Sequence, residues 1–213
     1  MSEHEGSVVT RMGDDGDPEP RNSPRSGDPT ATGDRGVLEP RSSPRSGEIA
    51  KPLPKVRVGI GWDSHRLVAG RPLIIGGVTI ESEAGLDGHS DADVLTHAII
   101  DALLGAAGLG DIGTHFPDSD ERWRGADSIA LLRQVVALVR DAGHEIVNVD
   151  ATLLLERPKI GPHRAAICER LAAALAIGPG DVNVKATTGE GIGFVGRGEG
   201  AAAQAVAMLE HAR

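Results

Sequence analysis

Asp63 and His65 stand two residues apart after the β-branched run KVRVGI, and both side-chain types bind metal ions. Alternate residues of a strand point to the same side, so these two ligand atoms can converge on one ion. Zinc takes imidazole nitrogen and carboxylate oxygen in tetrahedral geometry, and a catalytic zinc keeps one position open. The pair therefore predicts half of a metal site, with a solvated turn as the plainer alternative.

Four more candidate ligands follow in the chain: His89, Asp91, Asp93 and His97. The stretch 90–108 predicts a helix with apolar residues on one face: Val94, Leu95, Ala98 and Ala102. His97 instead shares the other side with Asp93 and Asp101, at steps of four residues. A core histidine would fall on the apolar face, so we predict His97 as the third ligand. The alternative is that the histidines are surface polar residues and the acids only cap the helix.

His89 and Ser90 stand at the predicted start of this helix, with Ser90 as its N-cap. The free N–H groups and the positive dipole end of a helix favour phosphate at that place. The segment GHSDAD therefore predicts an anion-binding corner beside the metal.

Two loops later in the chain could bind the rest of a phosphorylated ligand. The glycine-rich loop KATTGEGIGFVGRGEG, over 185–200, offers backbone N–H groups that can cradle phosphates, and Glu190 can hold Mg²⁺ against them. The loop LLLERPKIGPH, over 153–163, carries Lys159, which can meet a base and a phosphate. The alternative for the first loop is a plain tight connection, and the alternative for the second is a strand-to-helix connector.

The composition narrows the class of protein. A net charge of −9 argues against a general binder of nucleic acid or of an anionic membrane. The one cysteine, Cys168, excludes a disulfide and a cysteine-based zinc knuckle within one chain. No apolar run approaches the roughly 20 residues that span a bilayer. We therefore expect a soluble, cytoplasmic protein whose metal is held by histidines and carboxylates.

The first 52 residues differ from the rest. They are rich in Gly, Pro, Ser, Asp and Arg and contain a short repeat, EPRNSPRSGD and EPRSSPRSGE. Such composition cannot bury enough apolar surface to offset the ordering entropy, so we expect a disordered tail over 1–52 and one folded domain over 53–213. The tail is either an interaction or phosphorylation segment or a non-essential extension.

The folded part predicts a mixture of strands and helices. Strands are expected over 56–62, 145–156 and 181–188, with a hairpin over 72–80 that turns at Gly76-Gly77. Helices are expected over 90–108, 126–143, 162–177 and 198–212. This order favours an α+β (α/β sandwich) fold, with a mixed four-stranded main sheet, helices on one face and a small β-hairpin. The other face would suit burial in a homo-oligomer.

Several long blocks, in order, resemble the 2-C-methyl-D-erythritol 2,4-cyclodiphosphate synthases. They are RVGIGWDSH, IIGGVTI, GLDGHSDADVLTHAIIDALLGAAGLGDIGTHFPDSD, GADS, NVDATLLLERPKIGPH and DVNVKATTGEGIGFVGRGEG. The resemblance covers residues 57–211, which is essentially the whole folded part.

The resemblance implies a role for individual residues. The zinc ligands would be Asp63, His65 and His97, with the fourth position left to a substrate phosphate. His89 and Thr188 would stabilise the transferring phosphoryl group, and Glu190 would bind Mg²⁺ or Mn²⁺ through the substrate diphosphate. The implied substrate-binding residues are Ser90, Asp111, Gly113, Phe116, Asp118, Asp120, Leu155, Pro158, Lys159, Thr187, Phe194 and Arg197.

The implied activity is that of a phosphorus–oxygen lyase in the non-mevalonate pathway of isoprenoid (terpenoid) synthesis. The 2-phosphate of 4-diphosphocytidyl-2-C-methyl-D-erythritol 2-phosphate attacks the β-phosphorus, CMP leaves, and 2-C-methyl-D-erythritol 2,4-cyclodiphosphate forms. The family is homotrimeric, with the sheets packed inward and the active sites between adjacent subunits. The alternatives are a zinc-dependent nucleotide phosphohydrolase and a trimeric binding module with a structural zinc.

Gly189 departs from the family pattern, because many relatives have a third threonine there. The glycine removes a hydroxyl, but we expect its backbone N–H to remain available and phosphate binding to survive.

Overall fold

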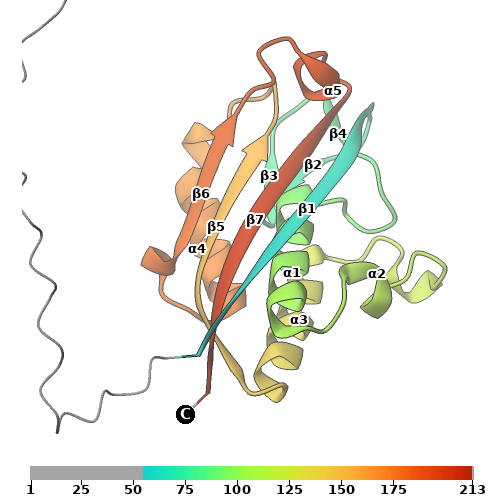
Figure 1. The fold of residues 1–213 in the computed structure, drawn as a ribbon. Helices are drawn as coiled ribbons and strands as arrows, with labels where there is room; N and C mark the ends of the chain where they lie inside the picture. The colour runs from blue at the N-terminus through green and yellow to red at the C-terminus, as the bar shows by residue number, and fades with distance from the viewer. Residues whose placement is uncertain (1–54, 213) are drawn as a thin grey trace, which may run out of the picture. The chain divides into compact units, whose positions relative to one another are not determined.

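The computed structural model describes residues 55–212, and the predicted tail over 1–52 lies outside them. The folded part is built on a mixed five-stranded sheet of order β4-β1-β7-β5-β6 (Figure 1). Its strands are β1 (Val56–Ala69), β4 (Ala84–Leu86), β5 (His144–Leu154), β6 (Val182–Thr187) and β7 (Gly200–His211). All neighbours are antiparallel except β5 and β6. The α+β prediction is confirmed, but the main sheet has five strands and not four.

The prediction of a closing helix over 198–212 is wrong, because this segment forms the central strand β7. Alanine favours helices, but here the chain pairs with β1 on one side and with β5 on the other. Alternate residues from Ala201 to Leu209 are buried, whereas Gln204 and Val206 are exposed. The period of two fits a strand, and tertiary pairing overrides the helix propensity of alanine.

Three longer helices cover one face of the sheet (Figure 1). They are α1 (Val94–Ala107), α3 (Ser128–Asp141) and α4 (Arg164–Leu175). The shorter elements are α2 (Ile112–His115), α5 (Gly193–Gly196) and the 3₁₀ turns η1 (Glu121–Trp123), η2 (Gly161–His163) and η3 (Pro179–Asp181). Helix α1 begins at Val94 and not at residue 90, because Asp93 and not Ser90 is its N-cap.

Strand β1 lets α1 approach very closely. A Cβ atom built on Gly61 would lie 1.9 Å from the carbonyl oxygen of Ala98, and one on Gly59 would lie 2.0 Å from that of Ala102. The alternation of the strand places Gly59, Gly61, Asp63 and His65 on the side of the helix. The same packing that excludes side chains at the glycines therefore brings Asp63 and His65 against α1.

The predicted hairpin is confirmed as β2 (Leu73–Ile75) and β3 (Val78–Ile80), joined at Gly76-Gly77. Both glycines have positive φ, 57° and 71°, which favours glycine at these positions. The buried Asp93 carboxylate accepts the N–H of Gly76 at 2.9 Å and that of Gly77 at 2.6 Å. Asp93 therefore ties the hairpin to the start of α1.

The other face of the sheet carries exposed apolar side chains. On β1, Val58 and Ile60 are each 64% exposed and Trp62 is 52% exposed, and Val206 of β7 is 39% exposed. Among the described residues, no helix has both the length and the apolar character needed to cross a membrane.

Candidate metal centre and ligand-binding cavities

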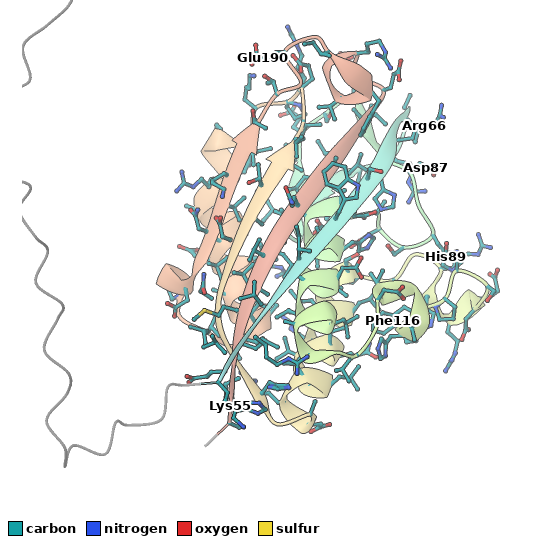
Figure 2. All side chains as sticks on the ribbon, viewed as in Figure 1. Lys55, Arg66, Asp87, His89, Phe116 and Glu190 are labelled. Atoms are coloured by element: carbon teal, nitrogen blue, oxygen red, sulfur yellow. The ribbon has the colours of Figure 1, made fainter. Side chains whose placement is uncertain are left out.

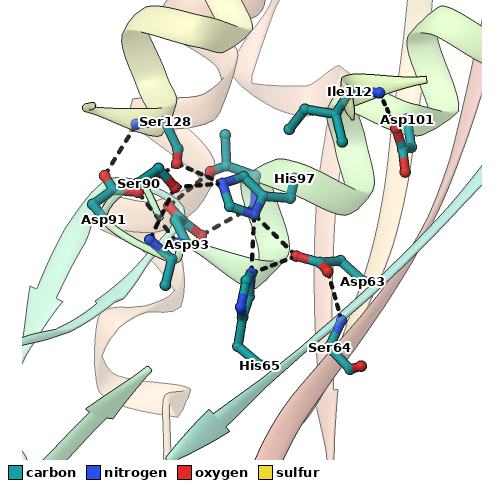
Figure 3. A network of polar contacts seen from close by, with 12 residues as sticks. Asp63, Ser64, His65, Ser90, Asp91, Asp93, His97, Asp101, Ile112 and Ser128 are labelled. Atoms are coloured by element: carbon teal, nitrogen blue, oxygen red, sulfur yellow. Dashed lines mark hydrogen bonds and ion pairs between the residues drawn. The ribbon is translucent and has the colours of Figure 1, made fainter. Parts of the chain in front are cut away.

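Asp63, His65 and His97 each bring one ligand atom to a common point (Figure 3). His65 Nε2 lies 2.9 Å from Asp63 Oδ2, and His97 Nδ1 lies 3.0 Å from the same oxygen. The two ring nitrogens are 3.2 Å apart. The first two residues come from β1 and the third from α1, so the structure brings together the three predicted ligands.

His97 and Asp101 line the same cavity, as their spacing of four residues predicts, but His97 is buried and does not lie on a solvent-exposed side of α1. The helix packs on the sheet and on α3, and most of its residues are buried, among them Thr96 and His97. His97 as a residue is only 8% exposed, and its ring lies between β1 and the start of α3. A buried histidine is costly unless its nitrogens are paired, and both nitrogens of His97 have partners.

The triangle of ligand atoms fits a bound cation. Zinc with bonds of about 2.0–2.1 Å in a tetrahedron places its ligand atoms about 3.3 Å apart, close to the separations seen here. His65 Nδ1 lies 2.8 Å from the carbonyl oxygen of Asp87, which can only accept, so Nδ1 carries the proton and Nε2 presents a lone pair. A carboxylate oxygen and a ring lone pair that face each other at 2.9 Å require a cation or a proton between them.

The pKa shifts of Asp63 and His65 also favour a positive charge in the cluster. Burial alone would lower the pKa of His65, but the hydrogen bond and the negative charge of Asp63 raise it above its usual value. Burial alone would raise the pKa of Asp63, but the hydrogen bonds with His65 and His97 hold it well below its usual range. Both shifts favour a positive charge on His65 beside the negative charge of Asp63.

A cavity of about 450 Å³ opens beside the cluster. It brings together the three ligands and five further predicted residues: His89, Ser90, Gly113, Phe116 and Asp118. The Ser90 hydroxyl lies 3.1 Å from His97 Nε2 and accepts the N–H of Ala92 at 3.2 Å. The residues predicted for an anion-binding corner therefore lie in the turn before α1, and in the first turn of the helix the N–H of Thr96 is already accepted by Asp93.

Asp111 and Asp120 do not line this cavity in the structure. Asp111 is the N-cap of α2 and accepts the N–H of Thr114 at 2.9 Å and its hydroxyl at 2.7 Å. The Asp120 carboxylate accepts hydrogen bonds from Arg122 Nε at both of its oxygens and from Arg122 Nη2 at one of them. Both carboxylates are engaged with their own loops.

Three residues of this site were given no role by the sequence reasoning. Asp101 lines the cavity and accepts the N–H of Ile112 at 2.8 Å, and its spacing from His97 was a usable signal. Trp123 lies edge-on to Phe116 with ring centroids 5.0 Å apart, and both rings line the cavity. Arg71 binds the Asp87 carboxylate and the carbonyl oxygens of Gly88 and Ser90, a contact that no local pattern could reveal.

A second cavity of about 290 Å³ gathers residues from the two loops. It is lined by Leu155, Pro158, Lys159, Ile160, Ala186, Thr187, Thr188 and Glu190. The Thr188 hydroxyl donates to the Glu190 carboxylate. The Gly189 N–H donates to Glu156 Oε2 at 3.0 Å, so the expectation that this N–H is free for phosphate is wrong for this structure.

Phe194 and Arg197 line neither of these two cavities. Phe194 lines a cavity of about 280 Å³ with Ser64, His65, Arg66, Glu199 and Gly200, and Arg197 Nε lies 2.7 Å from Glu199 Oε1. Figure 2 shows Glu190 at one end of the sheet, whereas His89 and Phe116 lie beside α1 and α2. Within one chain, the metal centre and the loop cavity share no lining residue.

The fold and the sequence match known proteins. The model of the YgbB family matches residues 56–210. A relative from Symbiobacterium thermophilum, 2-C-methyl-D-erythritol 2,4-cyclodiphosphate synthase, is 60% identical over 152 residues, which are 71% of this chain and 97% of that protein. Two solved structures of a 2C-methyl-D-erythritol-2,4-cyclodiphosphate synthase, one of them titled as a bound form with CDP, are 43% and 42% identical. Each has a TM-score of 0.67 and aligns with 72% of this chain and 99% of its own.

Proposed function

The chain belongs to the YgbB family, and from this premise we propose how its two cavities carry out the cyclodiphosphate synthase reaction. The enzyme converts 4-diphosphocytidyl-2-C-methyl-D-erythritol 2-phosphate to 2-C-methyl-D-erythritol 2,4-cyclodiphosphate and releases CMP, a step of isoprenoid synthesis by the non-mevalonate pathway. The single observation that carries the assignment of the site is the convergence of Asp63, His65 and His97 within a cavity of this fold. The single cysteine supports a reducing compartment, the cytoplasm, for the reaction.

Asp63, His65 and His97 hold one Zn²⁺ per subunit in this proposal. One carboxylate and two imidazoles leave one tetrahedral position open, which is typical of a catalytic and not of a structural zinc. When bound, the ion neutralises a phosphate of the substrate and acts as a Lewis acid. A local cation of this kind fits a chain with a net charge of −9, because the overall field of the protein does not attract a phosphorylated ligand.

The chemical step needs positioning more than proton transfer. The attacking 2-phosphate is already an anion, so the protein must align it with the β-phosphorus and stabilise the developing charge. Ser90 is suited to this, because its hydroxyl oxygen already accepts from Ala92 and its own hydrogen stays free for a phosphate oxygen. His89, in the same cavity, and Thr188, in the loop cavity, are the proposed donors to the transferring phosphoryl group.

The cavity beside the cluster binds the methylerythritol part. Phe116 and Gly113 form its wall, and the carboxylates of Asp118, Asp111 and Asp120 are the proposed partners of the hydroxyl groups. Asp111 and Asp120 must release their present loop contacts to do so.

The loop cavity binds the cytidine diphosphate part. Lys159, Leu155 and Pro158 surround the nucleoside, and Thr187 and Thr188 hold the diphosphate. Glu190, at the mouth of the same loop, binds Mg²⁺ or Mn²⁺ against that diphosphate. The bound CDP named for a similar structure supports a cytidine nucleotide as the ligand of this fold.

A homotrimer with active sites between adjacent subunits would join the two cavities. The separation of Glu190 from His89 within one chain (Figure 2) supports this, because one substrate must meet both groups. The exposed Val58, Ile60 and Trp62 supply an apolar sheet face for a partner subunit to cover. Phe194 shares a cavity with Ser64 and Arg66 of β1, and we place Phe194 and Arg197 at the proposed axis or near the substrate.

The test is to incubate the full chain with the cytidylylated substrate, zinc and Mg²⁺, and to identify the products by mass spectrometry. We expect the cyclic diphosphate and CMP in equal amounts, with no inorganic phosphate. Release of inorganic phosphate would indicate a nucleotide phosphohydrolase. Bound zinc without any turnover would indicate a binding module in which the zinc is structural.

A further inference from the structure

Ser128 lies on the far side of the His97 ring from the other two ligands (Figure 3). It is the first residue of α3, and its side chain is fully buried. Its hydroxyl oxygen is 2.8 Å from His97 Nε2, whereas the opposite ring nitrogen faces Asp63 and His65. The cap of α3 does not need this hydroxyl, because the Asp127 side chain accepts the N–H of Ile129.

The single hydrogen of the Ser128 hydroxyl is already used. It is donated to Asp91 Oδ1, and Asp91 Oδ2 accepts the N–H of Ser128 at 3.0 Å. Asp91 Oδ1 also accepts the N–H of Asp93 at 3.2 Å, so the carboxylate acts only as an acceptor. The Ser128 oxygen must therefore be the acceptor in its contact with His97.

The hydrogen bonds of Ser128 fix the tautomer of His97. Nε2 carries the proton and donates it to Ser128, so Nδ1 presents its lone pair to the point where Asp63 and His65 converge. His65 has the reverse tautomer, held by a backbone carbonyl that no side-chain substitution removes. Only the His97 ligand depends on side chains for its tautomer among the described residues.

We propose that Ser128 and Asp91 form a positioning relay, Asp91–Ser128–His97, that orients His97 and increases its basicity toward the bound metal ion. The inference rests on the proposed metal site and deepens it, because it assigns residues that touch neither metal nor substrate. Such partners behind a ligating histidine commonly contribute 10–100-fold to metal affinity.

Ser90 is the competing partner, and its geometry is weaker. Its oxygen is farther from His97 Nε2, at 3.1 Å, and it lies in the open cavity and not in the core. Its oxygen also accepts the N–H of Ala92, and it has no carboxylate partner that directs its hydrogen away from His97. We therefore assign the fixed acceptor role to Ser128.

The relay is tested by the zinc affinity of the full chain and of three variants, measured by competition with a chelator. Ser128→Ala and Asp91→Asn should bind zinc about 10–100-fold more weakly than wild type. Ser64→Ala is the matched control, because Ser64 lies between two ligands but its hydroxyl points away from the cluster (Figure 3), and its affinity should be unchanged.

A second readout separates positioning from stability. Nitrogen-15 NMR of the imidazoles in the metal-free protein should show His97 protonated at Nε2 in wild type and a mixture of tautomers in Ser128→Ala. If Ser128→Ala does not fold, as judged by thermal unfolding, Asp91→Asn takes its place in both measurements. Unchanged zinc affinity and an unchanged His97 tautomer in the folded variants would overturn the relay. Wild type that binds no zinc would instead overturn the metal site itself.

Discussion

The metal centre and the glycine-rich loop are built in opposite ways, although in the proposed reaction one substrate engages both. The metal ligands come from a 14-residue strand and a 14-residue helix that are packed together at glycine positions. Thr188 and Glu190 instead lie on an exposed loop, and their side chains bond each other. The comparison indicates that the proposed cation site is formed before any substrate arrives, whereas the proposed nucleotide side is completed by the substrate and by the neighbouring subunit.

The largest effect is expected from removing a ligand of the metal centre, which is the rigid one of the two regions. His65→Ala should lose the bound zinc and lower turnover by about 10³-fold or more, the equivalent of roughly 4 kcal/mol of transition-state stabilisation. Lys159→Ala, on the loop side, should keep a full complement of zinc and mainly raise KM. Metal analysis and steady-state kinetics of both variants check this, and full zinc content in a folded His65→Ala would refute the ligand assignment.

The close packing of β1 against α1 can be disturbed without changing a metal ligand. In Gly61→Ala, the new Cβ would meet the carbonyl oxygen of Ala98 at 1.9 Å, so we expect a loss of about 3 kcal/mol or more in the free energy of unfolding. Gly105→Ala in α1 is the matched control, because the nearest atom to its Cβ is 3.9 Å away. That change should stabilise the chain by about 0.5–1 kcal/mol. Urea unfolding of the two variants distinguishes a close approach of β1 and α1 from a loose one.

The same contrast explains what the sequence could predict. The Asp63–His65 pair follows from the period of a strand, and the hairpin follows from its two glycines, so both are local signals. The strand β7 and the buried setting of His97 are not local, because neighbouring strands and α3 decide them. The contact of Ser128 with Asp91 joins residues 37 apart in the chain, and no rule of sequence spacing predicts it.

The loop side should respond to loss of the hydrogen bond by which the Glu156 side chain holds it. Glu156→Ala removes the acceptor of the Gly189 N–H, and we expect KM for the substrate to rise about tenfold, since a hydrogen bond to a charged group contributes roughly 1.5–3 kcal/mol. Glu156→Gln keeps an acceptor oxygen and should stay close to wild type. Zinc content should not change in either variant. A fall in KM for Glu156→Ala would mean that the freed N–H binds phosphate and that Glu156 opposes it.

The smallest expected effect concerns the protons of Asp63 and His65 in protein stripped of metal by a chelator. The raised pKa of His65 contributes stability that is complete below about 6.5, its unfolded value, and is lost as the pH rises through the folded pKa. The lowered pKa of Asp63 contributes stability that is present above about 3.9 and is lost as the pH falls below it. The metal-free chain should therefore gain most from this pair between about pH 4 and 6.5, by a few degrees of unfolding temperature at most.

Zinc reverses the trend, because it must displace the proton from His65 and binds more tightly as the pH rises. His144, whose pKa is lowered by burial, acts against the trend of the metal-free chain, so the slope must be taken as the difference between wild type and His65→Gln. A difference that does not change between pH 6 and 8 would show that no proton holds the two side chains together when the metal is absent.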